Sequence, residues 1–195
     1  MEPESFGGRD VGQRVVYVDG FAKSLMPGLR VGYMIPPPAL YAPLLAAHRL
    51  RTLCGPTVMQ AALAEFLRRG DRERHLERVL PVFGDRREVL LRSLAQYMPQ
   101  GTEWIDPAGG LCVWLTLPEG ASTDETYRAA LASGVSVAPG DRFMPRPTAR
   151  GHLRLSLGSL PAERIPTAIE KLAGAIREVA RAGRELQREE AVPLV

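Results

Sequence analysis

Two basic side chains of different chemistry lie seven residues apart in GFAKSLMPGLRVGY, residues 20–33. Lys23 is one of only two lysines in a chain with 25 lysines and arginines, the other being Lys171. A lysine amine that loses its proton can attack an aldehyde and form an imine, whereas a guanidinium stays protonated at physiological pH. Arg30 can bind a phosphate through two parallel hydrogen bonds. Together, Lys23 and Arg30 suit a phosphorylated aldehyde.

The residues between these two cations predict a tight bend. Pro27 and Gly28 are turn formers, and a bend there lets Lys23 and Arg30 face one cavity. The alternative from spacing alone is a surface loop that carries two solvated cations.

A third candidate is Arg154, in the segment HLRLSL at residues 152–157. Alternate residues of a strand share a face, so His152, Arg154 and Ser156 point one way and the leucines point into a core. Arg154 is then held on a rigid element. An ordinary half-exposed strand is the alternative.

The elements that position these side chains follow from the hydrophobic patterns. Two short strands, RVVYVDG (14–20) and RVGYMI (30–35), flank the lysine segment, and PPP (36–38) ends the second. Helices are predicted over 39–53 and 56–70, followed by a long amphipathic helix with a kink near Pro81 and Gly84. Beyond residue 100, strands TEWI, GGLCVWLTL, VSVAP and HLRLSL combine with helices at 122–133 and 161–182, the first capped by Ser122 or Thr123. We expect a helical connector (71–98) between a first domain remnant (1–70) and a small α/β domain (99–184), with a fraying polar tail (185–195).

Composition excludes several classes of function. The net charge of +3 comes from interspersed positive and negative residues, so we expect no nucleic-acid binding by this chain alone. No apolar stretch approaches a membrane span, and the first residues do not resemble a signal peptide, so we expect a cytoplasmic protein that does not contact membranes. The two cysteines and three histidines lack zinc spacing, so no metal is expected and both thiols are interpreted as buried and reduced. His75 is expected on a solvated face, and Trp104 and Trp114 in the core.

The motif FAKSLMPGLRVGY closely resembles the lysine motif of class I/II, fold-type I aminotransferases, which depend on pyridoxal phosphate (PLP). Its order of Lys, Pro-Gly-Leu-Arg and Gly-Tyr is especially similar to the aminotransferase-like domain of MocR-type regulators of the GntR family. The resemblance continues in family order and covers nearly the whole chain, through VMQAALAEFLRRGDRERHLERV, RREVLLRSL, PAGGLCVWLTLP, GVSVAPGDRF and HLRLSLGSLPAERI.

This resemblance implies an α/β fold class, the C-terminal portion of the fold-type I PLP-dependent transferase fold: the end of the large PLP-binding domain plus the small α/β domain. It also implies roles for three residues. Lys23 forms the imine with PLP and then shuttles a proton, Arg30 contacts the cofactor phosphate, and Arg154 grips the α-carboxylate of an amino-acid or 2-oxo-acid substrate. Full-length relatives imply a homodimer.

Two departures from the family pattern bear on function. Gly20 stands where the family has a serine or threonine that helps to hold the phosphate. Only 22 residues precede Lys23, whereas relatives carry most of the large domain there, so we expect this chain to be the C-terminal part of a larger protein. Three functions follow: a truncated PLP-dependent aminotransferase, the effector-binding domain of a MocR/GntR-type regulator, or an inactive fragment that binds no cofactor.

Overall fold

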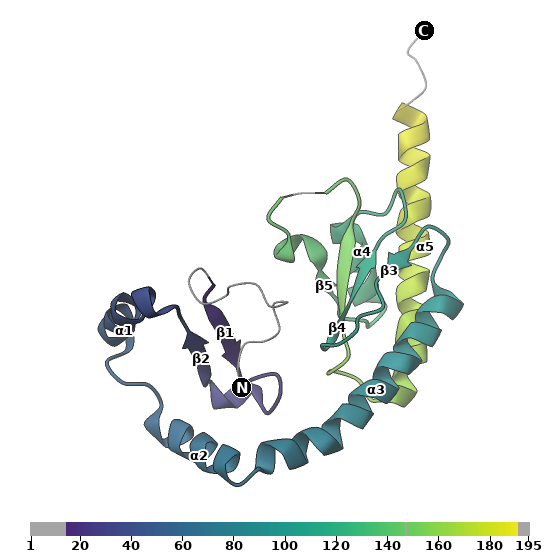
Figure 1. The fold of residues 1–195 in the computed structure, drawn as a ribbon. Coiled ribbons are helices and arrows are strands. Elements are labelled where there is room, and N and C mark those ends of the chain that lie inside the picture. The colour runs from purple at the N-terminus through teal and green to yellow at the C-terminus, as the bar shows by residue number, and fades with distance from the viewer. Residues whose placement is uncertain (1–14, 147, 191–195) are drawn as a thin grey trace. The chain divides into compact units, whose positions relative to one another are not determined.

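The structure is a computed structural model that describes residues 15–146 and 148–190. The chain divides into two compact units, residues 1–78 and 79–195, and Figure 1 labels most of their helices and strands. Helix α3 (Asp71–Tyr97) begins in the first unit and ends in the second. The mixed α/β class expected from the sequence is confirmed, while the finer division into four segments stays a prediction.

The first unit contains an antiparallel pair of strands, β1 (Tyr17–Gly20) and β2 (Gly32–Ile35). Gly20 lies opposite Gly32 at the end of the pair that opens into the lysine segment. A Cβ atom at Gly32 would lie 2.8 Å from the backbone oxygen of Asp19, so only glycine allows the two strands to approach this closely. Both predicted strands are present, and both begin later than the predicted residues 14 and 30.

Two helices follow the strands, α1 (Pro38–Thr52) and α2 (Thr57–Arg68), close to the predicted ranges. The three prolines end β2 because they cannot donate ladder hydrogen bonds, and Pro38 then occupies the first turn of α1, where proline is favoured. Gly70, with φ of 71°, terminates α2 in the left-handed conformation that glycine adopts without strain. The predicted end of the second strand at the prolines and the predicted end of α2 at Gly70 are therefore confirmed.

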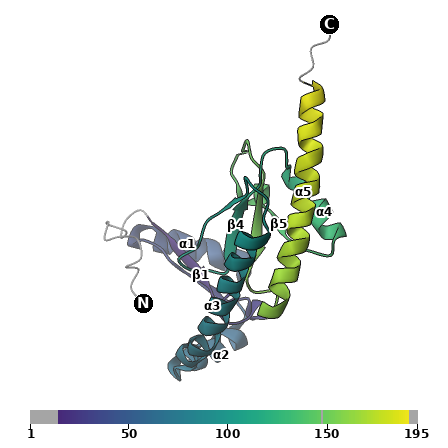
Figure 2. The same ribbon diagram turned by 90° about the vertical axis from the view of Figure 1, so that its right-hand side faces the viewer.

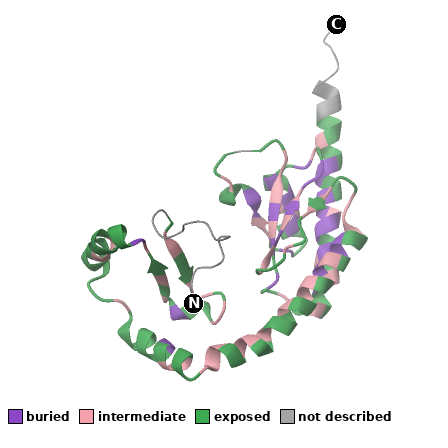
Figure 3. Cartoon of the chain, in the orientation of Figure 1, coloured by how far each residue is buried: buried purple, intermediate pink, exposed green. Residues whose placement is uncertain are grey.

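Most described residues of the first unit are exposed (Figure 3), and many of them are apolar. Among its described residues only Leu29, Pro37 and Leu63 are buried. Val18 on β1 is 65% exposed, and Leu53 after α1 is 91% exposed. These residues stabilise the unit little, because the gain from apolar burial is proportional to the area removed from water.

The second unit is built on a four-stranded antiparallel sheet of order β3-β4-β6-β5, as expected for a small α/β domain. Its strands are β3 (Glu103–Trp104), β4 (Cys112–Thr116), β5 (Ala138–Pro139) and β6 (His152–Ser156). Helices α4 (Thr123–Ala132) and α5 (Ile165–Glu190) complete the unit with the end of α3 (Figure 2). Side chains from the three helices pack on one face of β4 and β6 and form the core, which includes Leu90, Leu94, Val113, Leu115, Ala130, Leu153, Leu155, Leu172 and Ile176.

Local capping in the second unit agrees with the sequence. Ser122 is the N-cap of α4, and its hydroxyl oxygen accepts a hydrogen bond from the Glu125 backbone N–H at 3.3 Å. The last helix differs slightly, since Pro161 caps a short 3₁₀ helix (Ala162–Arg164) that leads into α5. No helix in the described ranges is long and apolar enough to cross a membrane.

Two expectations are wrong. Helix α5 continues to Glu190, whereas the sequence predicted a helix over 161–182 and a fraying polar tail over 185–195. The segment after Arg184 is rich in helix-forming Glu, Gln, Leu and Arg and contains no breaker before Pro193, which lies outside the described residues.

Neither cysteine is buried: Cys54 is exposed and Cys112 is half-buried, and both are free thiols. Cys54 lies beyond the end of α1, where none of the described elements covers its side chain.

Candidate functional site

Lys23 lies in the turn between β1 and a short 3₁₀ helix, η2 (Pro27–Leu29). The Phe21 N–H donates to the Val31 carbonyl at 3.2 Å, and the Leu25 N–H donates to the Phe21 carbonyl at 2.9 Å. The Lys23 side chain is exposed. No hydrogen bond or ion pair joins its amine to another side chain within the described part of the chain.

Arg30 follows η2 directly, and its backbone is left-handed, with φ of 51° and ψ of 29°. A non-glycine residue in this region costs about 1–3 kcal/mol. Its side chain is exposed, and among residues 15–146 and 148–190 no partner binds its guanidinium. The Pro-Gly bend predicted from the sequence is thus present, with a strained backbone at its last residue.

His75, expected on a solvated face, is half-buried and contacts the lysine turn. Its Nε2 atom lies 2.9 Å from the backbone oxygen of Ser24, and because that oxygen can only accept, Nε2 is the donor. The bond anchors the residue next to Lys23 to the first turns of α3. The sequence carried no signal for it, because 51 residues separate the two partners.

Gly20, three residues before Lys23, stands where the family has a serine or threonine, and the structure leaves room there for such a side chain. At Gly20 the nearest heavy atoms to an added Cβ are 3.6 and 3.7 Å away, which is ordinary contact, so a serine would fit there.

Asp19 accepts hydrogen bonds from the hydroxyls of Tyr17 at 3.1 Å and Tyr33 at 3.4 Å. The Tyr33 hydroxyl, followed by the Asp19 carboxylate, raises the pKa of Tyr17 to about 12.

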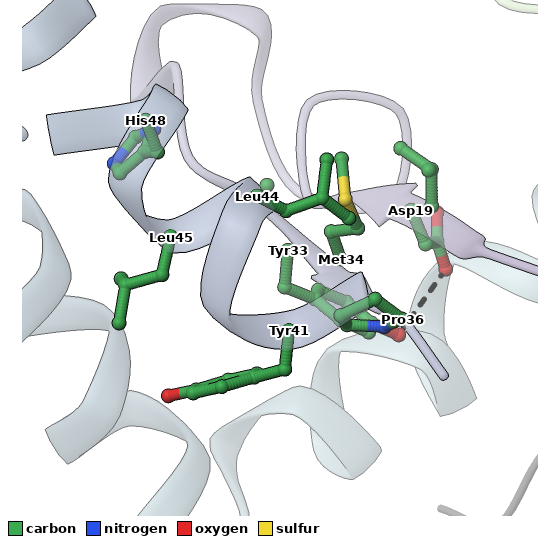
Figure 4. Close-up of a pocket in the computed structure, with 10 residues that line it drawn as sticks. Asp19, Tyr33, Met34, Pro36, Tyr41, Leu44, Leu45 and His48 are labelled. Atoms are coloured by element: carbon green, nitrogen blue, oxygen red, sulfur yellow. Dashed lines mark hydrogen bonds between the residues drawn. The ribbon is translucent and has the colours of Figure 1, made fainter. Parts of the chain in front are cut away.

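A cavity of about 440 Å³ lies between the strand pair and α1 (Figure 4). Most of the residues that line it are apolar, and Asp19 and His48 are among the titratable ones. The lining consists of Val18, Asp19, Gly32, Tyr33, Met34, Pro36, Tyr41, Leu44, Leu45 and His48. Neither Lys23 nor Arg30 lines it, so this hollow is distinct from the cavity that the sequence analysis expected them to share.

Arg154 belongs to the second unit, on β6, whose alternating burial confirms the predicted strand. Leu153 and Leu155 are buried in the core, while Arg154 is half-buried on the opposite face. Its guanidinium carbon lies 4.1 Å from the centre of the Phe143 ring. Trp114, expected in the core, lies opposite Arg154 on β4 and so shares its face of the sheet.

Comparison with known proteins identifies the family. The family model for aminotransferase class I and II matches residues 5–172. The aromatic-amino-acid aminotransferase 1 of Thermococcus litoralis is 33% identical over 165 residues, which are 85% of this chain and 40% of that protein. The HTH-type transcriptional regulator TauR of Rhodobacter capsulatus is 32% identical over 173 residues, 86% of this chain and 35% of the regulator.

A solved structure shares the fold. The α-aminoadipate aminotransferase LysN of Thermus thermophilus, complexed with N-(5'-phosphopyridoxyl)-L-leucine, superimposes with a TM-score of 0.79 at 32% identity, covering 86% of this chain and 43% of LysN. This chain therefore spans less than half the length of these relatives. The fold-type I assignment made from the motifs is confirmed, and the chain belongs to the class I and II aminotransferase family.

Proposed function

We propose that the chain supplies the lysine and two anion-binding arginines of a PLP-dependent aminotransferase, which moves an amino group from an α-amino acid to a 2-oxo acid. The observation that carries the proposal is the lysine segment itself. Lys23 and Arg30 are exposed within the family motif, and Arg30 has a backbone conformation that costs energy. Strain of this kind persists at functional sites when the surrounding structure maintains it.

The donor set of the first unit fits PLP, with an amine for its aldehyde and a guanidinium for its phosphate. When bound, the cofactor supplies that aldehyde and an electron-withdrawing ring. Arg30 binds the phosphate, and Arg154 binds the substrate α-carboxylate through in-plane N–H groups. The Lys23 Nζ atom, once free, takes a proton from the substrate Cα and returns one during the reverse half of the reaction.

The overall reaction balances without an external oxidant. The donor amino acid loses its amino group and the hydrogen on Cα, gains a carbonyl oxygen from water, and becomes a 2-oxo acid. The acceptor 2-oxo acid releases its carbonyl oxygen as water, gains an amino group and a hydrogen at the same carbon, and becomes an amino acid. The chain therefore needs two substrates of one chemical class, and the same carboxylate-binding arginine serves each in turn.

Reductive trapping tests the lysine assignment. The chain is mixed with PLP and reduced with borohydride, and the phosphopyridoxyl group is located by mass spectrometry of the peptides. We expect the label on Lys23, and Lys171, exposed on α5, is the internal control because these are the only two lysines. Equal labelling of both lysines would overturn the proposal for this chain.

Arg30→Gly is the matched variant for the phosphate contact. Glycine adopts the left-handed conformation without strain, so this change removes the guanidinium without destabilising the turn. We expect it to weaken labelling of Lys23 by PLP while leaving the thermal midpoint unchanged or higher. Undiminished labelling would show that Arg30 does not bind the phosphate.

A regulator is the second candidate, because TauR matches 86% of this chain. In such a regulator, this chain would bind the cofactor and an amino acid as effectors without converting the amino acid. Adding amino acids to the PLP-treated chain separates the two: an enzyme releases a 2-oxo acid and accumulates pyridoxamine phosphate, and a regulator does not. The homodimer and the cytoplasmic location stay predictions for the full-length protein.

A further inference from the structure

The open face of the second unit's sheet carries an aromatic cluster around Arg154. Trp114 lies opposite Arg154, and Thr116 lies opposite His152, in the β4–β6 register. The Trp114 ring meets the Phe143 ring edge to face, with centroids 6.4 Å apart at 80°, and it lies tilted against His152 at 5.4 Å. Phe143 in turn covers the Arg154 guanidinium at 4.1 Å.

Within this cluster Arg154 has an unused donor. Its Nε atom is buried and makes no hydrogen bond with any described residue. A buried N–H donor without a hydrogen-bond partner is costly, and such donors are rare in folded proteins. Since Nε–H lies in the guanidinium plane, an acceptor that approaches in that plane would satisfy it.

The position of Phe143 is compatible with such an acceptor. An aromatic face attracts a guanidinium through its quadrupole and lies over the plane, so it does not compete with the in-plane N–H groups. Phe143 ends the short 3₁₀ helix η3 (Gly140–Phe143) and is itself 49% exposed. Phe143 is therefore not a core residue, and its ring makes a cation–π contact with Arg154 and an edge-to-face contact with Trp114.

We propose that Phe143 is a positioning residue for Arg154: its ring holds the guanidinium plane so that the in-plane donors stay available to a substrate carboxylate. This inference rests on the proposed function, in which Arg154 binds that carboxylate. Phe143, the residue that η3 presents to the sheet, would then set the affinity of Arg154 for the carboxylate without touching the carboxylate itself.

The test is a titration of the full chain with propionate, which offers only a carboxylate, followed by NMR of the Arg154 Nε–H signal, assigned with Arg154→Gln. Propionamide is the uncharged control ligand. Phe143→Leu removes the ring and keeps the apolar bulk. We expect it to weaken propionate binding about 2- to 30-fold, the range that a cation–π contact of about 0.5–2 kcal/mol gives. The Nε–H signal should also lose its ring-current shift.

Phe143→Tyr keeps the ring and should bind propionate within about twofold of the unchanged chain, since tyrosine also supports the contact. If Arg154→Gln binds propionate as well as the unchanged chain, the carboxylate role of Arg154 fails and this inference with it. If Arg154→Gln abolishes binding while Phe143→Leu leaves both the affinity and the Nε–H shift unchanged, only the positioning role of Phe143 is overturned.

Discussion

Replacing Gly183 by alanine tests how tightly α5 packs on the rest of the second unit. A Cβ atom at Gly183 would lie 1.9 Å from the backbone oxygen of Gly120, with the Gly120 carbonyl carbon at 2.9 Å. Both obstacles are backbone atoms, so no side-chain rotation relieves the clash. Gly174, in the same helix, has no heavy atom within 4 Å of its added Cβ and is the matched control.

The two substitutions have the same intrinsic effect on the helix, but only Gly183→Ala introduces a steric clash. Alanine in place of glycine stabilises a helix interior by about 1 kcal/mol, and we expect Gly174→Ala to gain up to that amount. Overpacking costs about 1–3 kcal/mol, so Gly183→Ala should be less stable than Gly174→Ala by about that cost. With a denaturant slope of about 2 kcal/mol per M, the urea midpoints should differ by about 0.5–1.5 M.

Tryptophan fluorescence is a suitable probe because Trp104 and Trp114 are the only tryptophans and both lie in the second unit. The signal therefore follows the unfolding of that unit. If the two alanine variants shift the urea midpoint in the same direction and by the same amount, the close contact between Gly183 and Gly120 does not exist in solution.

Two further predictions concern polar contacts. Arg150, just before β6, donates to the backbone oxygen of Leu117 after β4, to the Glu103 carboxylate on β3 and to the backbone oxygen of Gly101 before β3. Arg150→Gln should therefore lower the free energy of unfolding by about 2–4 kcal/mol, measured in urea. Glu103→Gln removes only its exposed ion pair and should cost less than about 1 kcal/mol; equal losses would contradict this assignment. Tyr17 should keep its proton until about pH 12, so the stability from its raised pKa is fully present below pH 10 and is lost as the pH rises to 12. Tyr33→Phe should lower the pH midpoint at which the Tyr17 phenolate absorbance appears. An unchanged midpoint would exclude a contribution of the Tyr33 hydroxyl to the raised pKa of Tyr17.

Much of the fold could be predicted because the signals are local. The alternation of HLRLSL predicted the face on which Arg154 lies, since side chains on a strand point to opposite sides in turn. Ser122 as an N-cap and the prolines before α1 act on their own neighbours, so their effect is readable from a few residues. The family motif around Lys23 is likewise contiguous, and it predicted the family that the comparisons confirm.

The contacts that shape the candidate site are not local. His75 and Ser24 are 51 residues apart, and Trp114 lies 38–40 residues from its partners His152 and Arg154. His75 and Trp114 carry no local signal of these contacts, so the sequence analysis assigned His75 to a solvated face and Trp114 to the core. Sheet register decided that Trp114 shares a face with Arg154, and the turn after β5 decided that Phe143 covers it.

By itself, the sequence determined the elements, the family and the three candidate site residues Lys23, Arg30 and Arg154, because local periodicity and a contiguous motif encode them. Only the tertiary structure decided the left-handed backbone of Arg30 and the environment of each cation. The physical reason is that a conformation or contact of this kind depends on chain segments brought together by packing, which pairs residues according to burial and register and not according to their separation in the sequence.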